Sequence, residues 1–84
     1  MKRNNFEIYA DVLKVARSPQ RKTHLVYKAN LNFGIVNKYI NYLVEKGWLR
    51  KDDKFYSTTE EGEEFLDAFV KMHVLTVPTA PLVG

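Results

Sequence analysis

The chain has 84 residues, no cysteine and a formal net charge of +3. This length is enough for one compact domain and too little for two. The lack of cysteine excludes disulfides and thiolate zinc sites, and two histidines, His24 and His73, are too few for a structural zinc site. Because a core of this size is modest, dimerisation is the remaining source of extra stability.

The charges are distributed unevenly along the chain. Residues 1–51 carry eleven Lys or Arg against three acids, a balance of +8, whereas residues 52–84 carry two Lys against seven acids, a balance of −5. A basic half beside an acidic half indicates a polyanionic partner for the first half. Ordinary surface charge that happens to segregate is the alternative.

Neither a signal peptide nor a membrane span is indicated. The basic start is followed by Asn4-Asn5 instead of an apolar run, and no stretch approaches the length of a membrane-spanning helix. We therefore expect a cytoplasmic protein with no membrane partner.

The first predicted element is a helix over residues 5–16. Its apolar residues recur at spacings of three and four, so they form one stripe. Asn4 or Asn5 is the expected N-cap. The Ser-Pro dipeptide at 18–19 ends the helix, since proline disfavours helix in the residue before it.

Two further helices separated by a turn are predicted next. A very short strand at 21–22 leads into a short helix with Thr23 as its N-cap. The sequence Asn30-Leu31-Asn32 is a turn signal, and its second asparagine caps a third helix over 33–46 that ends before Gly47. One face of this third helix is apolar, with Val36, Tyr39, Ile40 and Leu43 at helical spacing.

A hairpin and a fourth helix complete the predicted order. Strands are expected at 48–50 and 54–57 around an Asp52-Asp53 turn. Thr58 to Glu61 has the form of a capping box for a helix that continues to about residue 74. We expect a domain over 1–75, followed by a flexible or extended tail over 76–84 that contains two prolines.

This order of elements predicts a mainly α fold with a small β-hairpin, in the α+β class. Helix, short strand, two helices joined by a turn, hairpin and final helix is the order of a winged helix-turn-helix domain.

Three stretches carry a family resemblance: KTHLVYKANLNF at 22–33, YLVEKGWL at 42–49 and TTEEGEEFL at 58–66. They resemble the small archaeal winged helix-turn-helix DNA-binding proteins, which include ArnR-like regulators and chromatin-associated winged-helix proteins of Sulfolobus. The resemblance implies DNA binding without enzymatic activity, and a homodimer joined through the terminal helices. Pro78 shortens the last helix, so a compact dimer is expected in place of a long coiled coil. Its expected interface residues are Phe6, Tyr9, Phe65, Phe69 and Met72.

The third helix is the predicted reader of double-stranded DNA, because a major groove admits one helix and its amino-terminal half meets the base edges. With the apolar face turned inward, the expected base contacts are Gly34, Ile35, Asn37, Lys38 and Asn41. Asparagines on a solvated face and a core role for Ile35 are the alternatives.

Phosphate contacts are expected on both flanks of this helix, where cations and hydrogen-bond donors are available. The candidates are Arg21, Lys22, Thr23, Asn32, Arg50, Lys51 and Lys54. The hairpin at 48–57 is the wing of this fold, and its acidic tip Asp52-Asp53 would repel phosphate. The alternative is therefore that the basic side chains of the wing are simply solvated and do not contact DNA.

No motif of an enzyme is present, and no cofactor or small-molecule ligand is predicted. A transcriptional regulator associated with the nucleoid is the function we expect. Two alternatives stay open: non-specific coating of chromatin, and a winged helix used for protein–protein interaction.

Overall fold

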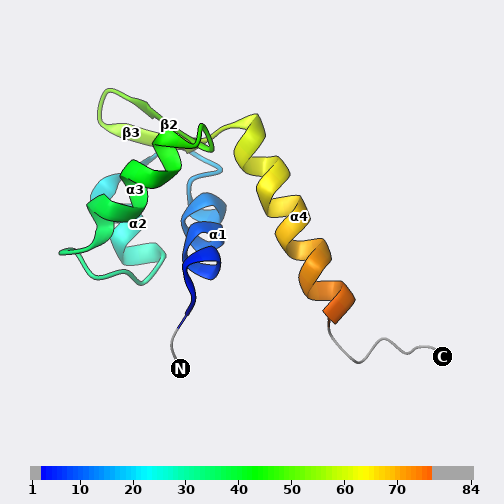
Figure 1. Cartoon of the computed structure of the whole chain (residues 1–84). Helices are drawn as coiled ribbons and strands as arrows, with labels where there is room; N and C mark the ends of the chain where they lie inside the picture. Colours follow the sequence, from blue (N-terminus) through cyan, green and yellow to red (C-terminus); the bar gives the residue numbers. More distant parts are fainter. Residues whose placement is uncertain (1–2, 77–84) are drawn as a thin grey trace.

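The computed structural model describes residues 3–76 of the chain, and side chains as far as Met72. It contains four helices and a three-stranded sheet, which confirms the predicted fold class (Figure 1). Beyond residue 76, the predicted tail lies outside the described residues. In chain order the elements are α1 (Asn5–Val15), β1 (Gln20–Arg21), α2 (Lys22–Lys28), α3 (Val36–Glu45), β2 (Leu49–Asp52), β3 (Phe55–Thr58) and α4 (Glu60–Thr76).

Helix α1 begins at a complete capping box. The Asn4 side chain accepts from the Glu7 N–H at 2.8 Å, and the Glu7 carboxylate accepts from the Asn4 N–H at 2.9 Å. Two of the free amide groups at the helix start are thereby satisfied. The prediction of Asn4 as one of two possible caps is confirmed.

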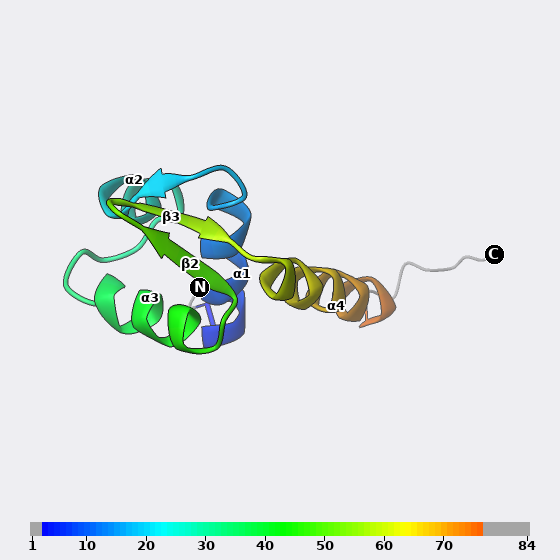
Figure 2. The ribbon, with the colours of Figure 1, turned by 90° about the horizontal axis from the view of Figure 1, so that it is seen from above.

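The sheet is antiparallel, with the strand order β1-β3-β2 (Figure 2). Gln20 pairs with Tyr56, so the predicted short strand lies one residue earlier than expected. The hairpin turn is also displaced. Asp52 pairs with Phe55 inside the ladder, and the turn consists of Asp53, with φ of 59°, and Lys54.

The core lies between α1, α2, α3 and the sheet. Apolar side chains from every helix and from β2 and β3 are buried in it, and no polar or charged residue of the described chain is buried. Its most enclosed side chains come from five elements and are Val12, Leu13, Leu25, Val36, Leu43, Leu49 and Leu66. Removing this apolar surface from water is the main stabilising contribution to the fold.

Helix α4 begins at Glu60, one residue later than a cap at Thr58 predicts. The Gly62 N–H donates to the Thr59 hydroxyl at 3.1 Å, so Thr59 is the cap and the expected Thr58–Glu61 pair is wrong. Thr58 is engaged elsewhere: its hydroxyl donates to the Leu13 carbonyl at 2.7 Å. From this start α4 projects away from α2 and α3, as both ribbon views show (Figures 1 and 2).

Candidate nucleic-acid interface

Helix α2 and the turn after it position α3. Leu25 and Ala29 are buried, which anchors α2 against the core. Asn30 adopts the left-handed conformation, with φ of 56°, and the Leu31 N–H donates to the Val26 carbonyl at 2.8 Å. Asparagine tolerates this conformation better than most residues. The predicted turn is therefore confirmed.

The start of α2 differs from the prediction. The helix begins at Lys22 with Arg21 in the N-cap position, and no side chain caps it. Thr23 therefore lies inside the first turn, and its assignment as the N-cap is wrong. Because β1 ends at Arg21, the pairing with β3 brings the chain into the helix without a capping residue.

The start of α3 also differs, and this changes the predicted reading segment. The helix begins at Val36, so Phe33, Gly34 and Ile35 lie in the preceding turn. Asn32 does not cap a helix at residue 33. Its side-chain oxygen accepts from the Gly34 N–H at 2.6 Å, and its carbonyl accepts from the Ile35 N–H at 3.1 Å. Such local bonds offer the backbone an alternative to the helix.

The two faces of α3 divide as predicted. Val36, Tyr39, Ile40 and Leu43 are buried. Asn37, Lys38 and Asn41, three of the predicted base contacts, are exposed on the remaining surface of the helix. The helix can therefore present amides and a cation outward while its apolar face holds it on the core.

One hydrogen bond joins two of the predicted contacts. Lys22 Nζ, at the start of α2, donates to Asn37 Oδ1 at 2.8 Å. The amide oxygen retains a second lone pair, and the amide nitrogen keeps both of its donors. This bond places an ammonium group beside the amide that would meet a base edge.

The segment from the last residues of α1 to the end of α3, just before Glu45, is free of acidic residues. Residues 12–44 contain no Asp or Glu, and they contain six basic residues: Lys14, Arg17, Arg21, Lys22, Lys28 and Lys38. Such a segment gives a positive potential with no internal counter-charge.

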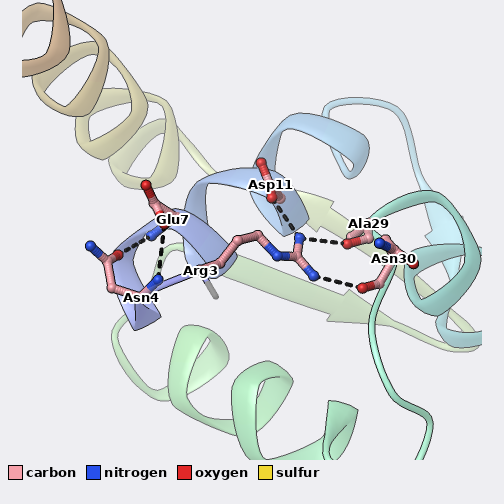
Figure 3. Close-up of polar contacts among 6 residues, drawn as sticks. All are labelled: Arg3, Asn4, Glu7, Asp11, Ala29 and Asn30. Atoms are coloured by element: carbon pink, nitrogen blue, oxygen red, sulfur yellow. Dashed lines mark hydrogen bonds and ion pairs between the residues drawn. The ribbon is translucent and has the colours of Figure 1, made fainter. Parts of the chain in front are cut away.

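Two arginines of the basic half form ion pairs within the fold. Arg17 donates both Nε and Nη2 to the Glu63 carboxylate of α4, at 3.0–3.2 Å, and this hydrogen bond raises the pKa of Arg17 above its ordinary value. Arg3 donates to the carboxylate of Asp11 and to the carbonyls of Ala29 and Asn30 (Figure 3). Both arginines were counted in the positive charge of residues 1–51, and part of that charge is therefore neutralised within the fold. No pattern in the sequence indicates these internal partners.

The wing carries exposed charges of both signs. Arg50, Lys51 and Lys54 are exposed, and so are Asp52 and Asp53. The wing turn and the turn before α3 lie on the same side of the molecule, away from α4, in both views (Figures 1 and 2). The predicted phosphate contacts of the wing are thus available to the same ligand as α3, together with two acids.

Arg21 has a partner that the sequence did not reveal. Its guanidinium lies over the ring of Phe55, 5.7 Å from the centroid, because these two residues pair across β1 and β3. The cation–π contact restricts Arg21 while leaving its donors available. Only the strand pairing brings the two residues together.

The predicted dimer residues divide between core and surface. Tyr9 is 7% exposed and stacks on Tyr42, with ring centroids 4.7 Å apart, so it has little surface to offer a second chain. Burial, with smaller contributions from Tyr42 and Tyr39, raises the pKa of its phenol. Phe6 and Met72, in contrast, are 55% and 58% exposed. Phe65 and Phe69 are half-buried and stack on each other.

The described part of the chain offers neither a metal centre nor a membrane-spanning helix. There, no group of three or more His, Cys, Asp or Glu side chains is placed to hold a metal ion. None of the helices between residues 3 and 76 is long and apolar enough to cross a membrane.

Comparison with known proteins covers most of the chain. A family model described as winged helix-turn-helix matches residues 2–76. An uncharacterized protein of Methanocaldococcus jannaschii is 32% identical over 79 residues, which cover 93% of this chain and 37% of that protein. A second uncharacterized protein of the same organism is 28% identical over 72 residues, which cover 84% of this chain and 74% of that protein.

Among solved structures, the chain is similar to Sso10a-2, a DNA-binding protein from Sulfolobus solfataricus. The TM-score is 0.72 at 27% sequence identity, and the match covers 84% of this chain and 82% of that chain.

Proposed function

We propose that this chain, which belongs to the winged helix-turn-helix family, binds double-stranded DNA with α3 in the major groove. The similarity to Sso10a-2, which is described as a DNA-binding protein, supports the proposal. The expected resemblance to small archaeal winged-helix proteins is confirmed by the same match and by the family model.

The observation that carries the proposal is the exposed face of α3. Asn37, Lys38 and Asn41 are exposed there, and Lys22 is bonded to the first of them. An asparagine amide matches the acceptor and donor that adenine presents in the major groove, and lysine matches guanine or phosphate. The lack of acids over residues 12–44 favours a polyanion over an acidic or neutral protein surface.

The phosphate grip in this proposal comes from both sides of α3. Arg21 and Lys22, at the start of α2, would contact one strand, and Arg50, Lys51 and Lys54 of the wing would contact the other. Thr23 and Asn32 would add uncharged contacts. The exposed acids Asp52 and Asp53 weaken the wing contribution, so we expect it to be the smaller of the two.

We further propose that the protein acts as a homodimer and regulates transcription from DNA sites with two-fold symmetry. The exposed apolar side chains of α1 and α4, on elements other than α3, support this proposal, because a two-fold partner would use the same patch on both chains. Non-specific coating of chromatin would leave the affinity for a selected site close to that for random DNA.

The test measures duplex binding as a function of salt by fluorescence anisotropy, with the full chain and a labelled random-sequence duplex. Lys38→Ala and Arg21→Ala are each expected to weaken binding and to reduce the slope of log K against log salt by about one unit. Lys71→Ala on α4 is the matched control, since Lys71 is exposed there and should leave the slope unchanged. Unaltered binding by both test variants would show that α3 is not the DNA-contacting surface.

A further inference from the structure

The turn that precedes α3 presents two large apolar side chains to solvent. Phe33 is 59% exposed and Ile35 is 42% exposed, and Gly34 lies between them. A ligand bound to α3 would cover both side chains and remove their apolar surface from water, which is favourable. The predicted base contacts included Ile35 and Gly34, and Phe33 was not among them.

The turn holds these side chains in a defined position. The Asn32 side chain and carbonyl accept from the N–H groups of Gly34 and Ile35, and the Ile35 carbonyl in turn accepts from the Lys38 N–H at 3.1 Å. The turn is therefore hydrogen-bonded both within itself and to the first turn of α3. Phe33 and Ile35 are held on a structured support at the amino end of the helix.

The surroundings of the pair favour DNA over a protein surface. The acid-free stretch of residues 12–44 includes this turn. Asn37 and Lys38 are exposed in the first turn of α3, directly after it, and Lys22 of α2 donates to Asn37. Both ribbon views place the turn at the opposite end of the molecule from α4, away from the proposed dimer contacts (Figures 1 and 2). An apolar pair bordered by cations matches a groove that exposes methyl groups between phosphates.

We propose that Phe33 and Ile35 contact the C5-methyl groups of thymine in the major groove and so favour thymine at the bases they reach. Thymine is the one DNA base that carries a methyl group there, and apolar side chains recognise it by contact. Gly34, without a side chain, lets the turn approach the base edges. This inference rests on the proposed DNA binding by α3, and it names a feature of the DNA that α3 favours.

The test compares two duplexes of one A·T-rich sequence, one with thymidine and one with deoxyuridine in its place. Deoxyuridine keeps the hydrogen-bonding pattern of thymidine and lacks only the methyl group. The wild-type chain is expected to bind the deoxyuridine duplex more weakly, by about fourfold for each methyl group that the pair would otherwise touch. The Phe33→Ala/Ile35→Ala variant is expected to bind both duplexes with equal affinity.

Each outcome bears on the proposal separately from the DNA binding itself. Equal binding of both duplexes by the wild type, or an unchanged thymidine preference in the variant, would overturn the role of this pair while leaving DNA binding in place. If the variant binds both duplexes as tightly as the wild type does, the pair makes no contact with the DNA. Absence of any duplex binding by the wild type would remove the proposed function as well.

The side chains replaced in this variant are exposed, so its fold is expected to persist, and far-ultraviolet circular dichroism checks this. The single variants Phe33→Ala and Ile35→Ala are each expected to retain part of the thymidine preference. A preference that disappears fully with one of them would assign the contact to that residue alone.

Discussion

At the scale of single residues, Gly62 shows how one missing side chain allows α4 to join the domain. It lies in the first turn of α4 and is buried. A Cβ built there would overlap the backbone carbonyl oxygen of Trp48 and would lie 2.7 Å from Thr58 Cγ2. The same Trp48 carbonyl accepts from the Thr59 N–H at 3.0 Å, so the close approach belongs to the bonds that attach α4.

We therefore predict that Gly62→Ala destabilises the protein by about 1–3 kcal/mol, because the added methyl group must displace backbone. Helix propensity alone predicts the opposite sign, since alanine is the better helix former by about 1 kcal/mol. Urea unfolding followed by circular dichroism measures the difference. Glu64→Ala, at an exposed position in the same helix, should stay within about 0.5 kcal/mol of the wild type. A gain in stability for Gly62→Ala would contradict the close approach.

At the scale of elements, Arg3 connects the start of α1 to the helix-turn-helix segment. Its Nη1 donates to Asp11 at 2.7 Å and to the Ala29 carbonyl at 2.8 Å, and its Nη2 donates to the Asn30 carbonyl at 2.6 Å (Figure 3). These carbonyls lie at the carboxyl end of α2, where a cation is favourable for the helix dipole. The guanidinium serves these three acceptors from two nitrogens in a planar fork, whereas an ammonium group would have to serve them from a single nitrogen.

We predict that Arg3→Ala lowers the free energy of unfolding by about 1–2 kcal/mol, with the partial exposure of the ion pair limiting the loss. Arg3→Lys should recover less than half of it, because the charge returns without the fork. Both variants should keep the wild-type salt slope for duplex binding, since these bonds occupy Arg3. A reduced slope in Arg3→Ala, measured beside Lys38→Ala, would instead make Arg3 a phosphate contact.

The sequence predicts the type and order of the elements better than their ends. The apolar spacing of Val36, Tyr39, Ile40 and Leu43 correctly identified the buried face of α3, because burial of a helix stripe requires that period. The start of α3 was placed three residues early, since an asparagine can either cap a helix or bond a turn, and both use the same side-chain oxygen. The contacts between distant residues, such as Arg21 over Phe55, depend on the strand register.

At the scale of the whole molecule, an aromatic series connects α3 with the side of α4 that packs against the core. Tyr42 contacts Trp48, Trp48 stacks on Phe65 at 4.4 Å, and Phe65 stacks on Phe69 at 6.0 Å. Phe6 of α1 lies beside this series, 6.4 Å from Phe65. The four rings of the series are partly buried and pack against the core, so the apolar core continues along the side of α4 that faces it.

The composition of the two ends separates their proposed tasks. The end with α2, α3 and the wing carries the basic charge, and α4 carries Glu60, Glu61 and Glu63 in its first turn. These acids would repel the phosphates of DNA from α4. Helix α4 is therefore better suited to contact a second copy of the chain than to contact the duplex. Two copies joined through α1 and α4 would present two α3 helices to one duplex.

We predict that the protein sediments as a dimer, at about twice its chain mass of 9.8 kDa, at micromolar concentration. Met72→Glu is expected to raise the dimer dissociation constant by about tenfold or more, because it would bury an unpaired charge at an apolar contact. Phe33→Glu is the matched control: it places the same charge on another exposed apolar residue, at the end that is proposed to face the DNA, and should leave the dimer unchanged. Sedimentation of the wild type as a single 9.8 kDa species would contradict the dimer, and equal weakening by both substitutions would exclude α4 as its specific interface.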